Sequence, residues 1–254
     1  MSENVRDPAV AGMFYPADPA DLRGMVEGFL ANVPAREGAV PKAIIAPHAG
    51  YIYSGPIAAS AYVCMRSANI QRVVLLGPAH RVWLEGVAAS SASAWRTPLG
   101  DVPVEAPDDV PVFDAAHAEE HSLEVQLPFL QVVLGDFTLI PLVVGQASKE
   151  EVAVILASLW GGDETLIVIS SDLSHYEDYK TASRMDSSAS QAIVDLDPAG
   201  LESKNACGCI PICGLLHLAK QKGMRAELID LRNSGDTAGS RDQVVGYGAY
   251  AFYE

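Results

Sequence analysis

Histidines follow three strongly apolar runs of this 254-residue chain, at His48, His80 and His175. Each run is short, rich in Ile, Val and Leu, and bounded by Pro, Gly or Ser, which is typical of strands buried on both faces of a parallel sheet. In open α/β sheets the ligand crevice lies beyond the carboxyl ends of the strands. We therefore expect the three imidazoles to converge on one site, which is the arrangement that a metal centre needs.

His48 and His80 each lie in a proline-containing turn, a few residues beyond an expected strand. Two neutral imidazoles on neighbouring strand ends supply half of a site for iron, zinc or copper. The alternative is that each ring only hydrogen-bonds a carbonyl group of its own turn. Matching positions on two strands favour the metal site.

A carboxylate and an imidazole, Asp172 and His175, share one short loop at the third strand end. Either Asp172 orients the ring of His175 and makes it an acid–base group, or both side chains join a ligand shell. Asp172 or Ser174 can instead cap the helix that follows, with His175 still functional. The loop therefore predicts a functional role for His175.

A polar segment from His117 to Glu124 leads into an expected helix. We expect His117 to be exposed to solvent, whereas His121 and Glu124 can reach the pocket. Glu124 also occupies the capping-box position relative to His121, so an ordinary carboxylate at a helix N-terminus is the alternative.

Three of the four cysteines lie in one short segment, at Cys207, Cys209 and Cys213. We expect free thiols rather than disulfides in this chain. Pro211 predicts the first helical residue, which puts Cys207 just ahead of a helix N-terminus and favours the thiolate that binds metals or attacks electrophiles. Packing is the alternative for Cys209 and Cys213, and Pro211 makes a zinc site of all three thiols awkward.

The composition excludes several classes of protein. A formal charge of −15, with no basic stripe to offset it, repels nucleic-acid backbones, so we expect no nucleic-acid partner. No apolar run approaches the ~20 residues of a membrane span, and the first residues lack a signal-peptide core. Because no linker divides the chain, we expect one domain over residues 1–254, in the cytoplasm and away from membranes.

Apolar strands and helical segments alternate along the chain, which predicts an α/β fold with a central, mostly parallel sheet flanked by helices. Asp18 is the expected N-cap of the first helix, Pro56 lies at the expected start of the second, and Pro128 interrupts the third. Helices are expected over residues 19–32, 54–65, 122–134, 149–159, 179–196 and 211–221, and further strands over 86–91, 100–104, 137–144, 165–170, 226–231 and 245–253, with 108–118 helical or irregular.

Motifs spread in order over nearly the whole chain resemble those of the Memo family. This family resembles class III extradiol dioxygenases in fold (LigB-like), which implies a central sheet flanked by helices with a pocket at the strand ends. The motifs are Val10-Ala-Gly-Met-Phe-Tyr-Pro16, Ala46-Pro-His-Ala-Gly-Tyr-Ile-Tyr-Ser-Gly55, Leu76-Gly-Pro-Ala-His80, Glu120-His-Ser-Leu-Glu-Val-Gln-Leu-Pro-Phe129, Ser170-Ser-Asp-Leu-Ser-His175, Cys207-Gly208 and Gly246-Tyr-Gly248.

The resemblance implies a metal site. The dioxygenases hold non-haem Fe(II) with two histidines and a carboxylate, and a further histidine serves as the acid–base group. His48 and His80 match the two imidazole ligands, and the third ligand of the Memo family is a cysteine, matched here by Cys207. A thiolate makes the site softer, so Fe(II) is the expected metal, with Cu or Zn as alternatives.

The resemblance also implies which residues surround the metal. Asp172 and His175 match the pocket Asp and His and form the expected catalytic pair, and His121 resembles another pocket histidine. Tyr51, inside the second motif, and Arg81, the one obvious cation beside the pocket, complete the expected binding residues.

The function expected from these observations is that of a metal-binding, redox-active protein of the non-haem dioxygenase-like superfamily. The alternative is a module that binds a small molecule or peptide without turnover, since animal members of the family are implicated in motility signalling and phosphotyrosine-peptide binding. Microbial members are associated with an AMMECR1-like protein and a radical SAM protein. A metal-free partner role in such a modification system is the third hypothesis.

Overall fold

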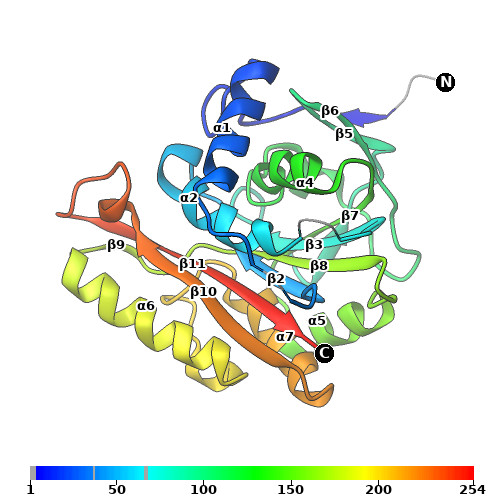
Figure 1. The fold of residues 1–254 in the computed structure, drawn as a ribbon. Coiled ribbons are helices and arrows are strands. Elements are labelled where there is room, and N and C mark those ends of the chain that lie inside the picture. The colour runs from blue at the N-terminus through cyan, green and yellow to red at the C-terminus, as the bar shows by residue number, and fades with distance from the viewer. Residues whose placement is uncertain (1–3, 37, 66–67) are drawn as a thin grey trace.

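An eight-stranded sheet lies at the centre of the molecule, with helices on both faces (Figure 1). The structure, a computed structural model, describes residues 4–36, 38–65 and 68–254, so residues 1–3 of the expected domain lie outside it. The strand order is β10-β11-β2-β8-β3-β7-β4, and β9 pairs with β11. The strands are β2 (Ala43–Ala46), β3 (Arg72–Pro78), β4 (Val87–Ala89), β7 (Thr138–Val144), β8 (Thr165–Ser170), β9 (His175–Glu177), β10 (Arg225–Asn233) and β11 (Val244–Tyr253).

The expectation of a mostly parallel sheet is correct for the centre and wrong for the edges. Strands β2, β8, β3 and β7 run parallel to one another, whereas β4, β9, β10 and β11 pair antiparallel. Parallel pairing needs a crossover of a dozen or more residues, and the short connection 234–243 between β10 and β11 permits only antiparallel pairing. The α/β class holds, with a mixed rather than mostly parallel sheet.

Each central strand sends alternate side chains into two hydrophobic cores. In β3, Val73 and Leu75 pack on one face, and Val74 and Leu76 pack on the other. Because both faces are covered, these strands read as continuous apolar runs. Helices α1 (Pro19–Ala31), α2 (Tyr51–Tyr62) and α4 (Leu127–Leu134) cover the first face, and α5 (Lys149–Ser158), α6 (Tyr179–Val194) and α7 (Cys209–Gln221) cover the second, as Figure 1 shows.

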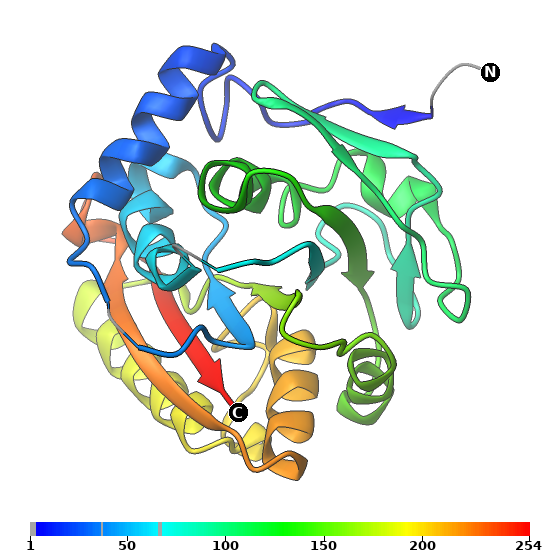
Figure 2. The same ribbon diagram turned by 45° about the vertical axis from the view of Figure 1, so that its right-hand side comes forward.

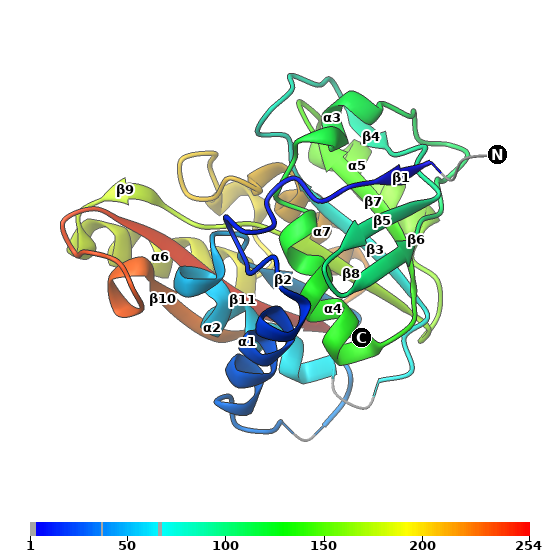
Figure 3. The same cartoon turned by 90° about the horizontal axis from the view of Figure 1, so that it is seen from above.

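A second, three-stranded sheet lies beside the first face. Its strands are β1 (Val5–Arg6), β5 (Ala94–Thr97) and β6 (Gly100–Pro103), which Figure 2 shows as the blue N-terminal strand beside a cyan-green hairpin. Seen from above, this sheet lies at the opposite end of the molecule from β9 (Figure 3). Of the segment 108–118, only α3 (Asp114–Ala118) is helical. Among the described residues, no helix has the length and hydrophobicity that crossing a bilayer requires.

Two helices begin a few residues before the starts that were expected from the positions of Pro56 and Pro211. Helix α2 begins at Tyr51, whose N–H donates to the carbonyl of Phe14 at 2.8 Å, and Pro56 lies inside the helix. Docking on the N-terminal segment outweighs the hydrogen bond that Pro56 forgoes. Helix α7 begins at Cys209, so Pro211 still lies among the first residues, whose N–H groups need no intrahelical partner.

The expected N-cap of the first helix is confirmed. The side chain of Asp18 caps α1 by accepting from the N–H groups of Ala20 and Asp21. The helix expected to be interrupted near Pro128 is divided just before that residue. A 3-10 helix, Glu124–Gln126, comes first, and α4 follows with Pro128 in its first turn.

Candidate metal centre

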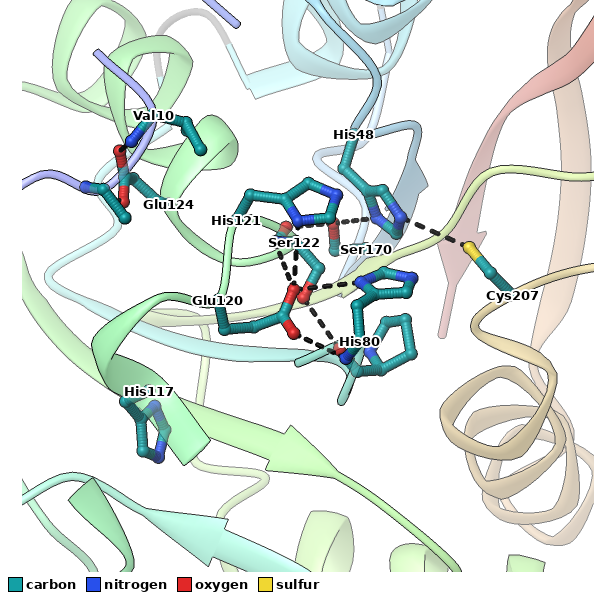
Figure 4. A network of polar contacts seen from close by, with 12 residues as sticks. Val10, His48, His80, His117, Glu120, His121, Ser122, Glu124, Ser170 and Cys207 are labelled. Atoms are coloured by element: carbon teal, nitrogen blue, oxygen red, sulfur yellow. Dashed lines mark hydrogen bonds and ion pairs between the residues drawn. The ribbon is translucent and has the colours of Figure 1, made fainter. Parts of the chain in front are cut away.

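His48 and His80 meet beyond the carboxyl end of the sheet, because they follow β2 and β3, the two neighbours of β8. Their ring centroids lie 5.2 Å apart. Cys207 comes from the loop before α7, and its Sγ lies 3.2 Å from Nε2 of His48 (Figure 4). One donor atom from each of His48, His80 and Cys207 can be chosen so that all three lie within 4.8 Å of one another.

This donor set fits a transition-metal ion. Metal bonds of about 2.0–2.1 Å to imidazole nitrogen and 2.3 Å to thiolate sulfur place the ligand atoms roughly 3.5 Å apart. The observed limit of 4.8 Å requires only small side-chain movements. Nitrogen and sulfur ligands of this kind suit Fe(II), Cu and Zn better than Mg or Ca.

Glu120 holds the ring of His80. The fully buried carboxylate accepts from the backbone N–H of His80 at 2.6 Å and lies 2.9 Å from ring Nδ1, and it also accepts from the N–H of Ser122. Burial alone would raise the pKa of Glu120, but the hydrogen bonds that the carboxylate accepts from His80 and Ser122 outweigh burial, and the pKa is lowered to about 2. Because a carboxylate only accepts, Nδ1 carries the proton and Nε2 is free for a metal. No role for Glu120 is evident in the sequence, although this residue opens one of the quoted motifs.

Asp172 holds the backbone of the candidate metal site and not the ring of His175. Its Oδ1 accepts from the backbone N–H of His48 at 2.7 Å, and burial raises its pKa to about 6. His175 lies in β9, and its Nδ1 donates to the carbonyl of Leu173 at 2.8 Å. The structure therefore does not show the expected orientation of His175 by Asp172, because the loop carbonyl of Leu173 holds Nδ1 of that ring.

The expectation that Cys207 is a thiolate is wrong for the protein without a metal. Burial and the nearby charge of Asp172 raise the pKa of the Cys207 thiol to about 12. These effects outweigh the N-terminus of α7, which begins two residues later with Gly208 as its N-cap. Metal binding would therefore release a proton from this thiol. Cys209 and Cys213 lie in the second core, with their sulfur atoms 3.9 Å apart.

Gly208 fixes the position of Cys207, and we predict that Gly208→Ala destabilises the protein. A Cβ at this position would lie 2.6 Å from Cβ of Ser171 and 2.9 Å from the carbonyl oxygen of Ser170. The expected loss is about 1–3 kcal/mol in the free energy of unfolding, measured with urea. Gly24→Ala, in α1 with no atom within 4 Å, is the control and should stabilise by roughly 0.5–1 kcal/mol. Equal stability of the two variants would contradict the prediction.

A cavity of about 650 Å³ adjoins the candidate ligands. Its lining includes the expected site residues His48, His80, Arg81, His121, Asp172 and His175. Aromatic walls come from Phe14, Tyr53, Tyr176 and Tyr247, none of which sequence analysis assigned to the site. The cavity therefore combines four imidazoles and one carboxyl group, which can transfer protons or bind a metal, with apolar surface for an organic ligand.

His121 stacks on His80, with ring centroids 4.8 Å apart. Burial lowers the pKa of His121 to about 4, so the ring is neutral near pH 7. Within the described part of the chain, its buried Nδ1 has no hydrogen-bond partner. His121 lines the cavity, and its Nδ1 lies 3.4 Å from Oε1 of Glu120 without forming a hydrogen bond.

Three expectations about nearby residues need correction. Tyr51 is absent from the cavity lining, because its buried hydroxyl donates to the carbonyl of Val125 at 2.6 Å. His117 is buried rather than exposed, with Nε2 donating to the carbonyl of Ala88. Glu124 lies away from the histidine cluster and binds the N-terminal segment through Val10 (Figure 4).

Comparisons with known proteins identify the family of this chain. A family model described as Memo-like protein matches residues 6–251. A MEMO1 family protein of Methanosarcina acetivorans is 39% identical, over 96% of this chain and 98% of the relative. Similar proteins of the same description occur in Ignicoccus hospitalis, 37% identical over 98% of both chains, and in Desulfurococcus amylolyticus, 36% identical over 98% of this chain and 99% of the relative. With matches of this extent, the chain belongs to the Memo-like protein family.

Proposed function

We propose that this protein is a metal-dependent, redox-active protein that holds Fe(II) through His48, His80 and Cys207, a donor set that would also accept Cu or Zn. The observation that carries the proposal is the approach of two imidazoles and a thiol to within 4.8 Å beside a large cavity. A reducing cytoplasm suits such a site, because Cys207 must remain a free thiol to bind the metal.

The chain's own residues supply binding and proton transfer. A bound Fe(II) would add one-electron chemistry and Lewis acidity. Because Nδ1 of His175 donates to Leu173, Nε2 is the ring atom that can take or give a proton in the cavity. The buried carboxyl of Asp172 holds the turn that carries His48. Arg81 and the aromatic walls suit a small molecule or peptide with an anionic group.

Elemental analysis of protein purified without oxygen tests this proposal. We expect near-stoichiometric iron in the wild type and its loss in His48→Ala, His80→Ala and Cys207→Ser, because each change removes one of three ligands. The control is His217→Ala, which changes a partly exposed histidine on α7, and this variant should keep its metal. Equal metal content in all five proteins would contradict the proposal.

A ligand-binding role without turnover is the second candidate, favoured by the presence of Arg81 in an aromatic-walled cavity. In that case a peptide or metabolite would bind the metal-free protein, with an AMMECR1-like or radical SAM protein as a partner. Calorimetry with a phosphotyrosine peptide tests it: binding that is lost in Arg81→Ala supports this role, and no heat from the wild type counts against it.

A further inference from the structure

The hydroxyl of Ser170 is the meeting point of three polar groups. Its Oγ lies 2.5 Å from the carbonyl oxygen of Ser122, 2.7 Å from Nε2 of Gln126 and 2.9 Å from Nδ1 of His48. Ser122, Gln126 and Ser170 are fully buried, and His48 is 2% exposed. The contacts of this hydroxyl are therefore set by the protein and not by solvent.

The donor and acceptor roles at Ser170 follow from its neighbours. A serine hydroxyl has one hydrogen to donate and two lone pairs to accept with. The carbonyl of Ser122 can only accept, so it receives the hydrogen. The side-chain nitrogen of Gln126 can only donate, so it takes one lone pair. The second lone pair faces Nδ1 of His48, which must therefore carry a hydrogen.

The orientation of the Gln126 amide is fixed by its other contacts. Its Nε2 also donates to the carbonyl of Pro47 at 3.0 Å, and its Oε1 accepts from the hydroxyl of Tyr62 at 2.8 Å. Exchanging oxygen and nitrogen would place the amide oxygen against the Pro47 carbonyl, where two acceptors repel. The donor role of Nε2 toward Ser170 is therefore secure.

We infer that Ser170 is a positioning residue that confines His48 to the tautomer with its proton on Nδ1. Nε2 is then the only ring nitrogen with a free lone pair, and it is the nitrogen that lies 3.2 Å from Sγ of Cys207. In the opposite tautomer, the lone pair of Nδ1 would face a lone pair of Ser170. His80 is held in the same state by the carboxylate of Glu120, so two different devices orient the two imidazoles.

The tautomer can be measured in the metal-free protein, independently of the proposed function. Nitrogen-15 NMR of histidine-labelled protein at neutral pH distinguishes protonated from bare ring nitrogens, and the signals of His48 are identified by their loss in His48→Asn. We expect a proton on Nδ1 in the wild type and in Ser170→Thr, which keeps the hydroxyl. Ser170→Ala should shift His48 toward the tautomer protonated on Nε2. A wild-type ring protonated on Nε2 would overturn the inference, even if a variant failed to fold.

The effect on metal binding rests on the proposed function and needs a second measurement. In anaerobic Fe(II) titrations, Ser170→Ala should bind about 10–100-fold more weakly than the wild type, and Ser170→Thr should bind close to the wild type. The control is Ser190→Ala, which removes another buried hydroxyl, one that contacts Tyr250 in a core position of α6. Unchanged Fe(II) affinity and an unchanged tautomer in Ser170→Ala would overturn the inference. Absence of Fe(II) binding by the wild type would instead overturn the proposed function and leave the NMR result to decide the tautomer.

Discussion

Glu120→Gln is expected to weaken metal binding by about 10–100-fold, although it changes only one side-chain oxygen to an NH₂ group. The carboxylate accepts from three donors, two on His80 and one on Ser122. An amide offers one oxygen, so its NH₂ group would point at one of these donors, and the ring of His80 would lose its fixed orientation. Anaerobic titration with Fe(II) measures the effect. Glu119→Gln, at the exposed neighbouring position, should bind like the wild type.

The same variant should change the response of stability to acid. The pKa of Glu120 is about 2 in the folded protein against 4.5 ordinarily, so the unfolded chain takes up the proton first as pH falls. Its contribution to stability, roughly 3 kcal/mol, is complete above pH 4.5 and is lost as pH falls from 4.5 to 2. Urea unfolding at several pH values should therefore show that the free energy of unfolding falls less steeply below pH 4.5 in Glu120→Gln than in the wild type. Parallel curves for variant and wild type would contradict this account.

Glu124→Ala is expected to lower the free energy of unfolding by about 3–5 kcal/mol. The buried carboxylate pairs with Arg6 at 2.7 Å and accepts from the hydroxyl of Tyr15 and from the N–H groups of Ala9 and Val10. Truncation would leave the guanidinium without its counter-charge and three buried or partly buried donors without an acceptor. The N-terminal segment would then lose its main attachment to the body of the protein.

Urea unfolding of Glu124→Ala tests this prediction. Glu27→Ala is the control, because it removes an exposed carboxylate whose nearest cation, Arg23, lies 4.0 Å away on the same helix. A surface pair of this kind should change stability by no more than about 0.5 kcal/mol. Similar losses in the two variants would contradict the structural role of Glu124. Because Phe14 lines the cavity, a real loss should also weaken ligand binding there.

The parts of the candidate site that could be predicted from sequence are those encoded by short, local patterns. His48 and His80 follow apolar runs, and an apolar run that ends at Pro or Gly predicts both a buried strand and the position of its carboxyl end. Strand ends of a parallel sheet share one edge, so the convergence of these rings follows from the strands alone. The helix cap at Asp18 is local in the same sense, and the structure confirms it.

Burial reversed other expectations, because it depends on which elements pack together. His117 and Glu124 lie in a polar segment, which suggests that their side chains face solvent or the pocket. The N-terminal segment covers both of them instead: Arg6 donates to the carbonyl of His117 and to the carboxylate of Glu124. The helix start near Cys207 suggests a thiolate, but burial raises the pKa of that thiol. Neither the covering by Arg6 nor the burial of Cys207 can be predicted from the residues next to each position in the sequence.

By itself, the sequence determined where the candidate ligand histidines would lie, because the apolar run of each strand and the Pro or Gly that ends it are features of neighbouring residues. Only the tertiary structure decided how those histidines are held. Glu120 is 40 residues from His80, and Ser170 is 122 residues from His48. A hydrogen bond depends on distance and direction in space, so pairs this far apart in the chain become partners only when the strands that carry them are assembled into one sheet.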